Sequence, residues 1–427
     1  MVYKKVYNKI MKNEEFKEIL LKQFNEKYYE PKELEYSKEV NTLLSPFEFK
    51  KFLEYKENIA SIDNAYVTKL PLLSFNSKCL YYSFGNDLKS LLEDYVRLIN
   101  EDNTLNDRFS KDFIESRIYS EIEGTLNVEN VPTTRRRLKE LLEDNAPIKD
   151  KNDIIIKNMK AGIDFVNELP DFNQKNLYKL YGLLSNNCLD EEDKLLPNNY
   201  YRHDAVGIDR YHGCPTSKIE ECMNVFFDYV NKALKSKDNI QILLLPHISH
   251  YYILYIHPYF DYNGRTARMV SYWIYLLSGK NMFSPIMSEA INQTKSTYYK
   301  AIELTRDTHN DLTYFFKYLL SISIDYVICY ENLNHLQQVS KNNGYVLTQT
   351  ELNYMKKILI SYNGVFNYLD FLKMVNINIT KQGAFKILNK FINFGFLKEV
   401  NTNSKSKLFD INEKNIPYVL KHFGYKG

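Results

Sequence analysis

The chain has 427 residues, of which 44% are hydrophobic and 26% charged, so its composition is that of a globular protein and excludes an intrinsically disordered one. Its 56 Lys and Arg nearly balance its 53 Asp and Glu, and the net charge of +3 argues against a globally basic nucleic-acid coat. Five scattered cysteines form no C-x-x-C pair, and we find neither a signal peptide nor an apolar run approaching the ~20 residues that span a bilayer, so we expect a cytoplasmic protein with no disulfide scaffold and no membrane partner.

Residues 1–105 are predicted to form a helical region with irregular connections. Two charged amphipathic segments, Asn13–Tyr28 and Lys89–Asn100, carry apolar residues at intervals of three and four, which is the period of a helix. The region contains no catalytic motif. We therefore expect it to serve as a scaffold or as a surface for a partner.

Residues 106–330 are predicted to form a helical core. Its first helix is expected over residues 109–124, because Ile114, Ile118 and Ile122 form one apolar stripe and Gly124 can adopt the left-handed conformation that ends a helix. A short hairpin is expected around Tyr200–His212. Further helices are predicted over residues 154–169, 173–184, 218–234 and 239–255.

Residues 345–427 are predicted to form a separate domain, joined to the core at a hinge in Ser340–Gly344. Three helices (351–361, 366–375 and 381–394) precede two strands (396–401 and 407–411), which is the order of a winged helix-turn-helix. From residue 331 onward the chain has 13 Lys, no Arg and 6 acidic residues, so this part is basic. DNA is therefore one partner that the sequence allows for it.

The sequence H-P-Y-F-D-Y-N-G-R-T-A-R at residues 257–268 interrupts the apolar helices. A helix is predicted to end before it, and the next to start at Asn263-Gly264, so that backbone N–H groups at a helix N-terminus form an anion site. Arg265 and Arg268 are three residues apart and share a face of the first turn, where they can bind phosphate oxygens.

The same segment contains Asp261, which can hold Mg²⁺ against phosphates, and His257, whose unperturbed pKa near neutrality suits a general base. Each feature alone also has a structural explanation. A histidine before proline is often structural, and a pair of arginines often forms a solvated helix face. Their combination within twelve residues of an Arg-poor chain favours a functional site.

This segment resembles the signature of Fic domains, H-x-F-x-D/E-G-N-G-R-x-x-R, and the resemblance extends over roughly residues 110–330. Tyr259 replaces the usual phenylalanine. Tyr262 replaces the first glycine of the turn, where it either strains the backbone that wraps a phosphate or projects its ring into the site. The matching residues are His257, Asp261, Asn263, Gly264, Arg265 and Arg268.

Other segments resemble further parts of the family. Tyr201–Ile208 is similar to the flap, so Val206, Gly207 and Ile208 are implied to align a target chain by strand addition. The resemblance also implies that Tyr298 and Tyr299 lie on the adenine side of the site.

Ser120-Glu121-Ile122-Glu123-Gly124 resembles the inhibitory helix of the family, whose pattern is S/T-x-x-x-E-G/N. Glu123 and Gly124 match, whereas Ser120 stands one residue late. The resemblance implies that Glu123 pairs with Arg268 and occupies the place of the ATP γ-phosphate.

The resemblance thus implies a mainly α protein with a Fic-type helical core, a β-hairpin flap and a C-terminal winged helix. The implied activity is that of a protein adenylyltransferase (a nucleotidyltransferase): AMP passes from ATP to Ser, Thr or Tyr hydroxyls of a target protein or of the chain itself, with Mg²⁺ as cofactor. A winged-helix transcriptional regulator with a nucleotide-sensing or inert Fic site stays open as an alternative, as does protein de-AMPylation. A homodimer is also left open.

Overall fold

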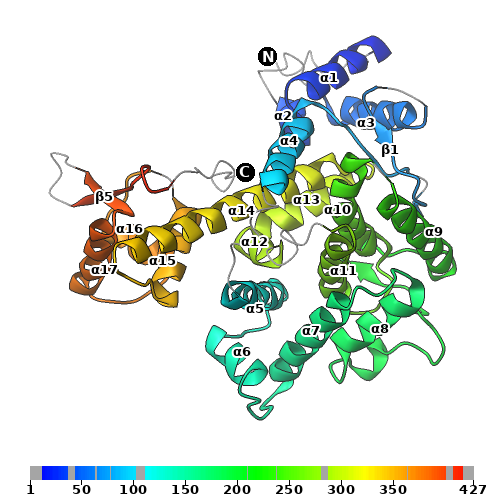
Figure 1. Ribbon diagram of the computed structural model, residues 1–427. Helices are drawn as coiled ribbons and strands as arrows, with labels where there is room; N and C mark the ends of the chain where they lie inside the picture. The colour runs from blue at the N-terminus through cyan, green and yellow to red at the C-terminus, as the bar shows by residue number, and fades with distance from the viewer. Residues whose placement is uncertain are drawn as a thin grey trace. The chain divides into compact units, whose positions relative to one another are not determined.

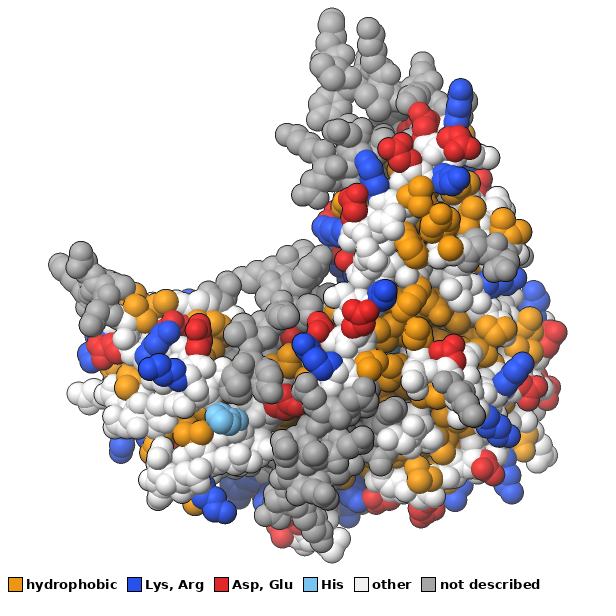
Figure 2. All heavy atoms as spheres, turned by 45° about the horizontal axis from the view of Figure 1, so that its top comes forward, with side chains coloured by type: hydrophobic (Ala, Val, Ile, Leu, Met, Phe, Trp, Pro, Cys, Tyr) orange, Lys and Arg blue, Asp and Glu red, His pale blue; other side chains and the backbone are white. Residues whose placement is uncertain are grey.

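A computed structural model describes most of the chain, and it is mainly helical (Figure 1). It divides into two compact units, residues 1–320 and 321–427, and no helix in the described ranges combines the length and apolar character needed to cross a bilayer. Basic and acidic side chains are interspersed over the face that Figure 2 shows. The described residues are 12–36, 44–62, 65–76, 78–101, 111–208, 210–236, 238–279, 287–362, 364–400 and 407–416.

The N-terminal region is fixed to the rest of the first unit by a buried polar cluster. The Lys56 ammonium lies 2.5 Å from the Asp311 carboxylate, which also accepts a hydrogen bond from the Tyr28 hydroxyl. The pairing satisfies a charge that would be costly to bury alone. The elements of this region are α1 (Asn13–Asn25), α2 (Pro31–Tyr36), α3 (Pro46–Ala60), β1 (Thr68–Lys69), β2 (Tyr81–Tyr82) and α4 (Asn86–Glu101).

The rest of the first unit is a helical core with one hairpin. Its centre is α10 (Asn239–Ile256), which is buried on every side from Leu243 onward and packs against α11 (Asn263–Leu277) (Figure 1). The remaining elements are α5 (Lys111–Val128), α6 (Arg135–Leu142), α7 (Lys151–Asn167), α8 (Gln174–Ser185), a 3₁₀ turn (Glu191–Asp193), β3 (Gly207–Ile208), β4 (Tyr211–His212), α9 (Thr216–Leu234), α12 (Met287–Gln293), α13 (Lys295–Asp307) and α14 (Thr313–Asn342), which continues into the second unit.

Helix α5 continues past the predicted end at Gly124, so that prediction was wrong. A Cβ atom at Gly124 would lie 2.5 Å from the backbone nitrogen of Glu289 in α12. Gly124 is therefore a helix-packing position: its missing side chain lets two helices approach closely. It does not end the helix.

In the second unit, three helices are followed by an antiparallel hairpin, in the order that the sequence predicts. The ammonium of Lys390 pairs with Glu351, and that of Lys407 lies 3.0 Å from Glu399, so both charges are partly neutralised within the unit. The winged-helix assignment and the domain boundaries near residues 105, 330 and 345 stay predictions. The elements are α15 (Gln349–Ser361), α16 (Tyr368–Val375), α17 (Lys381–Asn393), β5 (Leu397–Val400) and β6 (Leu408–Ile411).

Candidate active site

The turn between α10 and α11 has two residues in the left-handed conformation that glycine usually occupies. His257 has φ 54° and Tyr262 has φ 65°. Such a conformation costs a non-glycine residue on the order of 1–3 kcal/mol and persists only where its surroundings hold it. Tyr262 therefore keeps the backbone path that a glycine would give, at the expense of strain.

The side chain of Asn263 holds this turn closed. Its Oδ1 accepts a hydrogen bond from the backbone N–H of Tyr259 at 3.0 Å, and its Nδ2 donates to the Tyr259 carbonyl at 2.8 Å. The Tyr259 ring stacks on Tyr181 with centroids 3.7 Å apart. The amide of Asn263, predicted to bind phosphate, is thus engaged in shaping the loop.

His257 is half-buried at the C-terminal end of α10. Burial, together with the positive charges of Arg306 and Arg202, lowers the pKa of its imidazole to about 4, against a smaller opposing effect of the Leu254 backbone. The ring is therefore neutral at pH 7. A neutral imidazole has a free lone pair and can accept a proton, as the general base predicted from the sequence would have to do.

Arg265 is the buried cation of the first turn of α11, with 7% of its surface exposed. Its guanidinium carbon lies 3.6 Å from the centroid of the Tyr262 ring, which is a cation–π contact. Its Nε and Nη1 atoms are buried without a hydrogen-bond partner among the described residues. Buried donors without partners are costly, so a bound anion would stabilise this arrangement.

Arg268 is paired with Glu129 and not with the predicted Glu123. Its Nη2 lies 2.5 Å from Oε1 of Glu129, and its Nε donates to the Thr125 hydroxyl at 2.8 Å. Burial by itself would raise the pKa of the Glu129 carboxyl group. The positive charges of Arg268 and, to a lesser extent, Arg265 outweigh burial, so the pKa of Glu129 is lowered. The carboxylate is ionised at neutral pH and lies in the predicted anion site.

The same carboxylate reaches the N-terminus of α11. A Cβ atom at Gly264 would lie 2.6 Å from Oε1 of Glu129, so any side chain at this position would displace the Glu129 carboxylate. Glu129 thus fills the space that backbone N–H groups and the two arginines offer to an anion.

The predicted inhibitory residues lie elsewhere on α5. Glu123 lies 4.0 Å from Arg135 of α6, and the hydroxyl of Ser120 accepts a hydrogen bond from the same guanidinium at 3.1 Å. The predicted pairing of Glu123 with Arg268 was therefore wrong: α5 continues past Gly124, and Glu129, directly after its end, lies against Arg268. The pattern S/T-x-x-x-E-G/N fits Thr125-Leu126-Asn127-Val128-Glu129-Asn130 at every fixed position, and this signal was present in the sequence.

The two tyrosines predicted on the adenine side, Tyr298 and Tyr299, differ in their exposure to solvent. Tyr298 is 1% exposed, its hydroxyl lies 2.8 Å from Nε2 of His250, and its ring packs in the core. Its adenine-side role stays a prediction. Tyr299 is exposed to 44%, and its role stays a prediction.

The hairpin β3–β4 returns directly to the His257 turn. Gly207 pairs with His212 and Ile208 with Tyr211, while the backbone N–H of Gly213 donates to the carbonyl of Val206 at 3.1 Å. The Tyr211 hydroxyl donates to Asp307 of α13 at 2.6 Å, which ties the hairpin to the core. The side chain of Ile208 lies outside the described residues, so its predicted contact with a target chain stays a prediction.

Asp261 is the exposed carboxylate of the loop. Its Oδ1 accepts a hydrogen bond from the backbone N–H of Tyr262 at 2.6 Å, and no group of three potential metal ligands occurs among the described residues. Mg²⁺ is commonly held by one or two carboxylates together with substrate phosphates. A single carboxylate beside an anion site therefore fits a Mg²⁺ that arrives with a phosphate compound.

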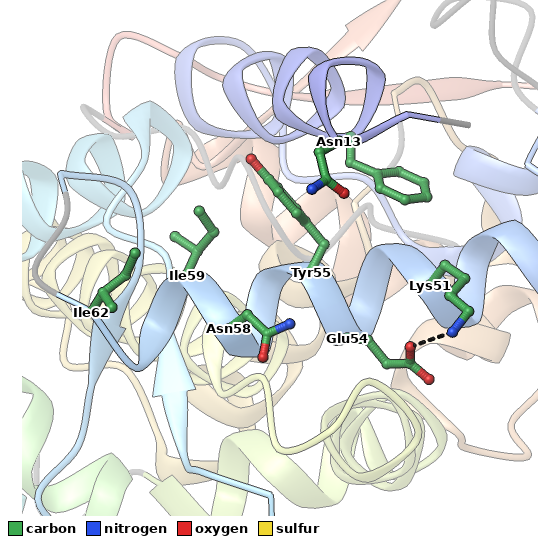
Figure 3. Close-up of a pocket in the computed structure, with 8 residues that line it drawn as sticks. Asn13, Lys51, Glu54, Tyr55, Asn58, Ile59 and Ile62 are labelled. Carbon is green, nitrogen blue, oxygen red and sulfur yellow. Dashed lines mark hydrogen bonds and ion pairs between the residues drawn. The ribbon is translucent and has the colours of Figure 1, made fainter. Parts of the chain in front are cut away.

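A cavity of about 300 Å³ lies between α1 and α3 and is shown in Figure 3. Its wall includes an ion pair in which the Lys51 ammonium lies 2.9 Å from the Glu54 carboxylate. None of its lining residues belongs to the 257–268 segment, so it is separate from the site described above. The lining residues are Asn13, Phe16, Lys51, Glu54, Tyr55, Asn58, Ile59 and Ile62.

Fold and site together define a helical domain whose central turn carries a neutral histidine and is followed by two buried arginines. Residues 171–275 match the sequence model of the Fic/DOC family. A protein named protein adenylyltransferase Fic, from Nematostella vectensis, is 29% identical over 119 residues, a match that spans 28% of this chain and 26% of that protein.

A solved structure supports the fold. A Fic family protein from Desulfovibrio desulfuricans superposes with a TM-score of 0.51 at 17% identity, covering 77% of this chain and 97% of that one. Fic-1 from C. elegans gives a TM-score of 0.43 at 19% identity, covering 57% of this chain and 70% of its own.

The contact between α5 and α12 includes a buried carboxyl group that titrates near neutrality. Glu121 accepts a hydrogen bond from the backbone N–H of Ser288 at 2.8 Å. Burial raises the pKa of Glu121 from 4.5 to about 7. The hydrogen bond and the charge of Arg268 act against this increase, whereas the negative charge of Glu289 adds to it. Because the folded state holds the proton more tightly, the stabilisation is complete below about pH 4.5 and is lost as pH rises through 7.

We therefore expect the free energy of unfolding to fall between pH 5 and pH 8, by up to about 3 kcal/mol from this group. Glu121→Gln should remove that part of the pH dependence, measured by urea unfolding at several pH values. Glu123→Gln, on the same helix with 35% of its side chain exposed, is the matched control and should leave it unchanged. An identical pH dependence in wild type and Glu121→Gln would contradict this assignment.

Proposed function

We propose that this chain is a protein adenylyltransferase that transfers AMP from ATP to a Ser, Thr or Tyr hydroxyl of a protein, including itself. The observation that carries the proposal is that one short segment carries neutral His257 and, eight residues later, buried Arg265, whose Nε and Nη1 have no hydrogen-bond partner among the described residues. The Fic/DOC match and the name of the N. vectensis relative support the same reaction class.

In the proposed reaction, the target hydroxyl lies against the β3–β4 hairpin and approaches His257. Because Nδ1 of His257 is buried, Nε2 accepts the hydroxyl proton. The hydroxyl oxygen forms a bond to the α-phosphorus of ATP, the bond from that phosphorus to the bridging oxygen of pyrophosphate breaks, and pyrophosphate leaves with the electron pair. The charge that develops on the phosphate oxygens is stabilised by Arg265 and by the N–H groups at the start of α11.

Asp261 would hold Mg²⁺, which when bound neutralises charge on the phosphates. Asn263 contributes by fixing the loop through the backbone of Tyr259, and Gly264 by leaving room for a phosphate. Arg268 would receive the γ-phosphate once the Glu129 carboxylate has left it.

We further propose that Glu129 inhibits the chain. Its carboxylate holds the guanidinium face that a phosphate would need, so ATP and Glu129 compete for the same donors. Activity then depends on movement of the segment that follows α5.

The test of the reaction is incubation of the full chain with ATP labelled at either the α- or the γ-phosphate, in the presence of Mg²⁺. Label retained on protein from α-labelled ATP alone establishes AMP transfer. Retention of the γ-label would show phosphoryl transfer and overturn the proposal. The assay uses Glu129→Gly as well as wild type, so that inhibition does not conceal the activity.

The stacking of Tyr262 on Arg265 leads to a prediction about nucleotide affinity. In the Glu129→Gly background, Tyr262→Gly relieves backbone strain but removes the contact that orients the guanidinium. A cation–π contact contributes about 0.5–2 kcal/mol, so we expect ATP to bind about 3- to 30-fold more weakly. Calorimetric titration with ATP and Mg²⁺ measures the change. Tyr262→Phe retains the ring and should bind like its parent, whereas tighter binding in Tyr262→Gly would show that strain dominates.

A further inference from the structure

The guanidinium of Arg202 joins the hairpin segment to the His257 turn. Arg202 is 3% exposed, and its Nε donates to the carbonyl of His257 at 2.8 Å. Its Nη1 donates to the carbonyl of Asp204 at 2.5 Å, and its Nη2 donates to that of Cys214. All three carbonyls belong to the hairpin segment or to the turn, so one side chain fixes their mutual positions.

The backbone of the same residue adds a fourth contact. The N–H of Arg202 donates to the carbonyl of Pro258 at 2.9 Å, so Arg202 bonds both the carbonyl of the His257–Pro258 peptide and the carbonyl of the peptide that follows it. Because His257 is in the left-handed conformation, the His257–Pro258 peptide would relax to another orientation if it were not held. The imidazole would move with it.

The returning hairpin chain leaves little space around the Arg202 guanidinium. A Cβ atom at Gly213 would lie 2.8 Å from Nη2 of Arg202 and 3.4 Å from Cβ of His257, so the returning chain passes directly against both residues. No side chain with a single donor can reach three carbonyls in this geometry, whereas the fork of a guanidinium can.

We propose that Arg202 is a positioning residue for His257: by bonding the carbonyls of His257, Asp204 and Cys214 together, it fixes the imidazole against the hairpin that presents the target hydroxyl. The proposal rests on the proposed function, since it concerns how the base of that reaction is oriented. Arg202 touches neither substrate nor reacting atoms.

The charge of Arg202 has a second, separable effect. Together with the positive charge of Arg306, it disfavours the protonated form of His257. Arg306 donates to the carbonyl of Leu254 in α10 at 3.1 Å, and its guanidinium carbon lies 4.8 Å from the centroid of the Tyr211 ring. At Arg202 itself, lysine retains the charge and loses the guanidinium geometry, so the two effects can be varied separately there.

The experiment measures self-modification by α-labelled ATP in the full chain carrying Glu129→Gly, as a function of ATP concentration and of pH. Arg202→Lys retains the charge but not the fork. We expect its maximal rate to fall about 30- to 100-fold, since a displacement of about 1 Å can reduce a rate about 100-fold, with the half-saturating ATP concentration unchanged. Arg202→Gln should lower the maximal rate by the same factor as Arg202→Lys. It should also move the rising limb of the pH–rate profile to higher pH, because loss of a positive charge near His257 raises the pKa of that imidazole. Arg306→Gln should move that limb in the same direction while it retains most of the maximal rate.

Circular dichroism and calorimetric ATP titration establish that each variant is folded. A folded Arg202→Lys that retains its maximal rate within about threefold would overturn the positioning role. The positioning role would also be overturned if the rate fell only in proportion to the loss of folded protein and the rising limb of the pH–rate profile did not move in Arg202→Gln. Such a result would show a purely structural role for Arg202. If the Glu129→Gly parent itself transfers no label, the proposed function fails instead, so the two failures are distinguishable.

Discussion

We expect replacement of His257 to abolish AMP transfer while ATP binding survives. A general base contributes about 10²–10⁴ in rate, whereas nucleotide binding depends on the start of α11 and its arginines. Because His257 is in the left-handed conformation, His257→Asn is the preferred variant, since asparagine tolerates this conformation better than alanine does. His257→Ala should give the same loss of labelling.

The comparison is made in the Glu129→Gly background, with the initial rate of α-label transfer and the dissociation constant for ATP measured on the same preparations. Unchanged ATP affinity in His257→Asn assigns the loss to the chemical step. Labelling at the parental rate in both variants would show that His257 does not accept the proton, and the proposed mechanism would be wrong.

The second large effect is expected at Glu129. Its ion pair with Arg268 is largely buried on the arginine side, where 2% of the side chain is exposed. A hydrogen bond between charged groups contributes about 1.5–3 kcal/mol, which corresponds to an increase of roughly 10- to 100-fold in the productive nucleotide complex. Glu129→Gly should therefore raise the rate of AMP transfer by about that factor at limiting ATP.

Glu123→Gly is the matched control, because it places the same substitution on the same segment one and a half turns earlier. Glu123 lies near Arg135 and not in the anion site, so the rate of AMP transfer should change little. Activation by Glu123→Gly without activation by Glu129→Gly would mean that the pairing seen in the structure does not inhibit. Equal rates in wild type and Glu129→Gly at every ATP concentration would remove the inhibitory role of Glu129.

The fold class followed from the sequence because its signals are local. Helical periodicity, few glycines and prolines, and the abrupt polar segment after an apolar helix predicted α10, the turn and the start of α11 to within a few residues. The types of chemistry at His257, Asp261 and the two arginines also followed, since a base, a carboxylate and cations at a helix N-terminus are recognisable by residue type alone.

Which carboxylate meets Arg268 was decided only by the tertiary structure. The sequence offers Glu121, Glu123 and Glu129 within nine residues, and the choice depends on how far α5 extends and how it packs on α12. Gly124 suggested a helix end, but its absent side chain serves a contact with Glu289, 165 residues away in the chain. Long-range packing thus overrode a local capping signal.

The sequence by itself indicated that a histidine, a polar loop and a predicted anion site follow one another along residues 257–268. Only the tertiary structure decided how they are held, because the groups that hold them come from distant segments. Arg202 bonds the strained carbonyl of His257, and Glu129 fills the anion site. Tyr262 shows both contributions: its place in the pattern is visible in the sequence, whereas the side on which its ring stacks follows from the packing of Arg265.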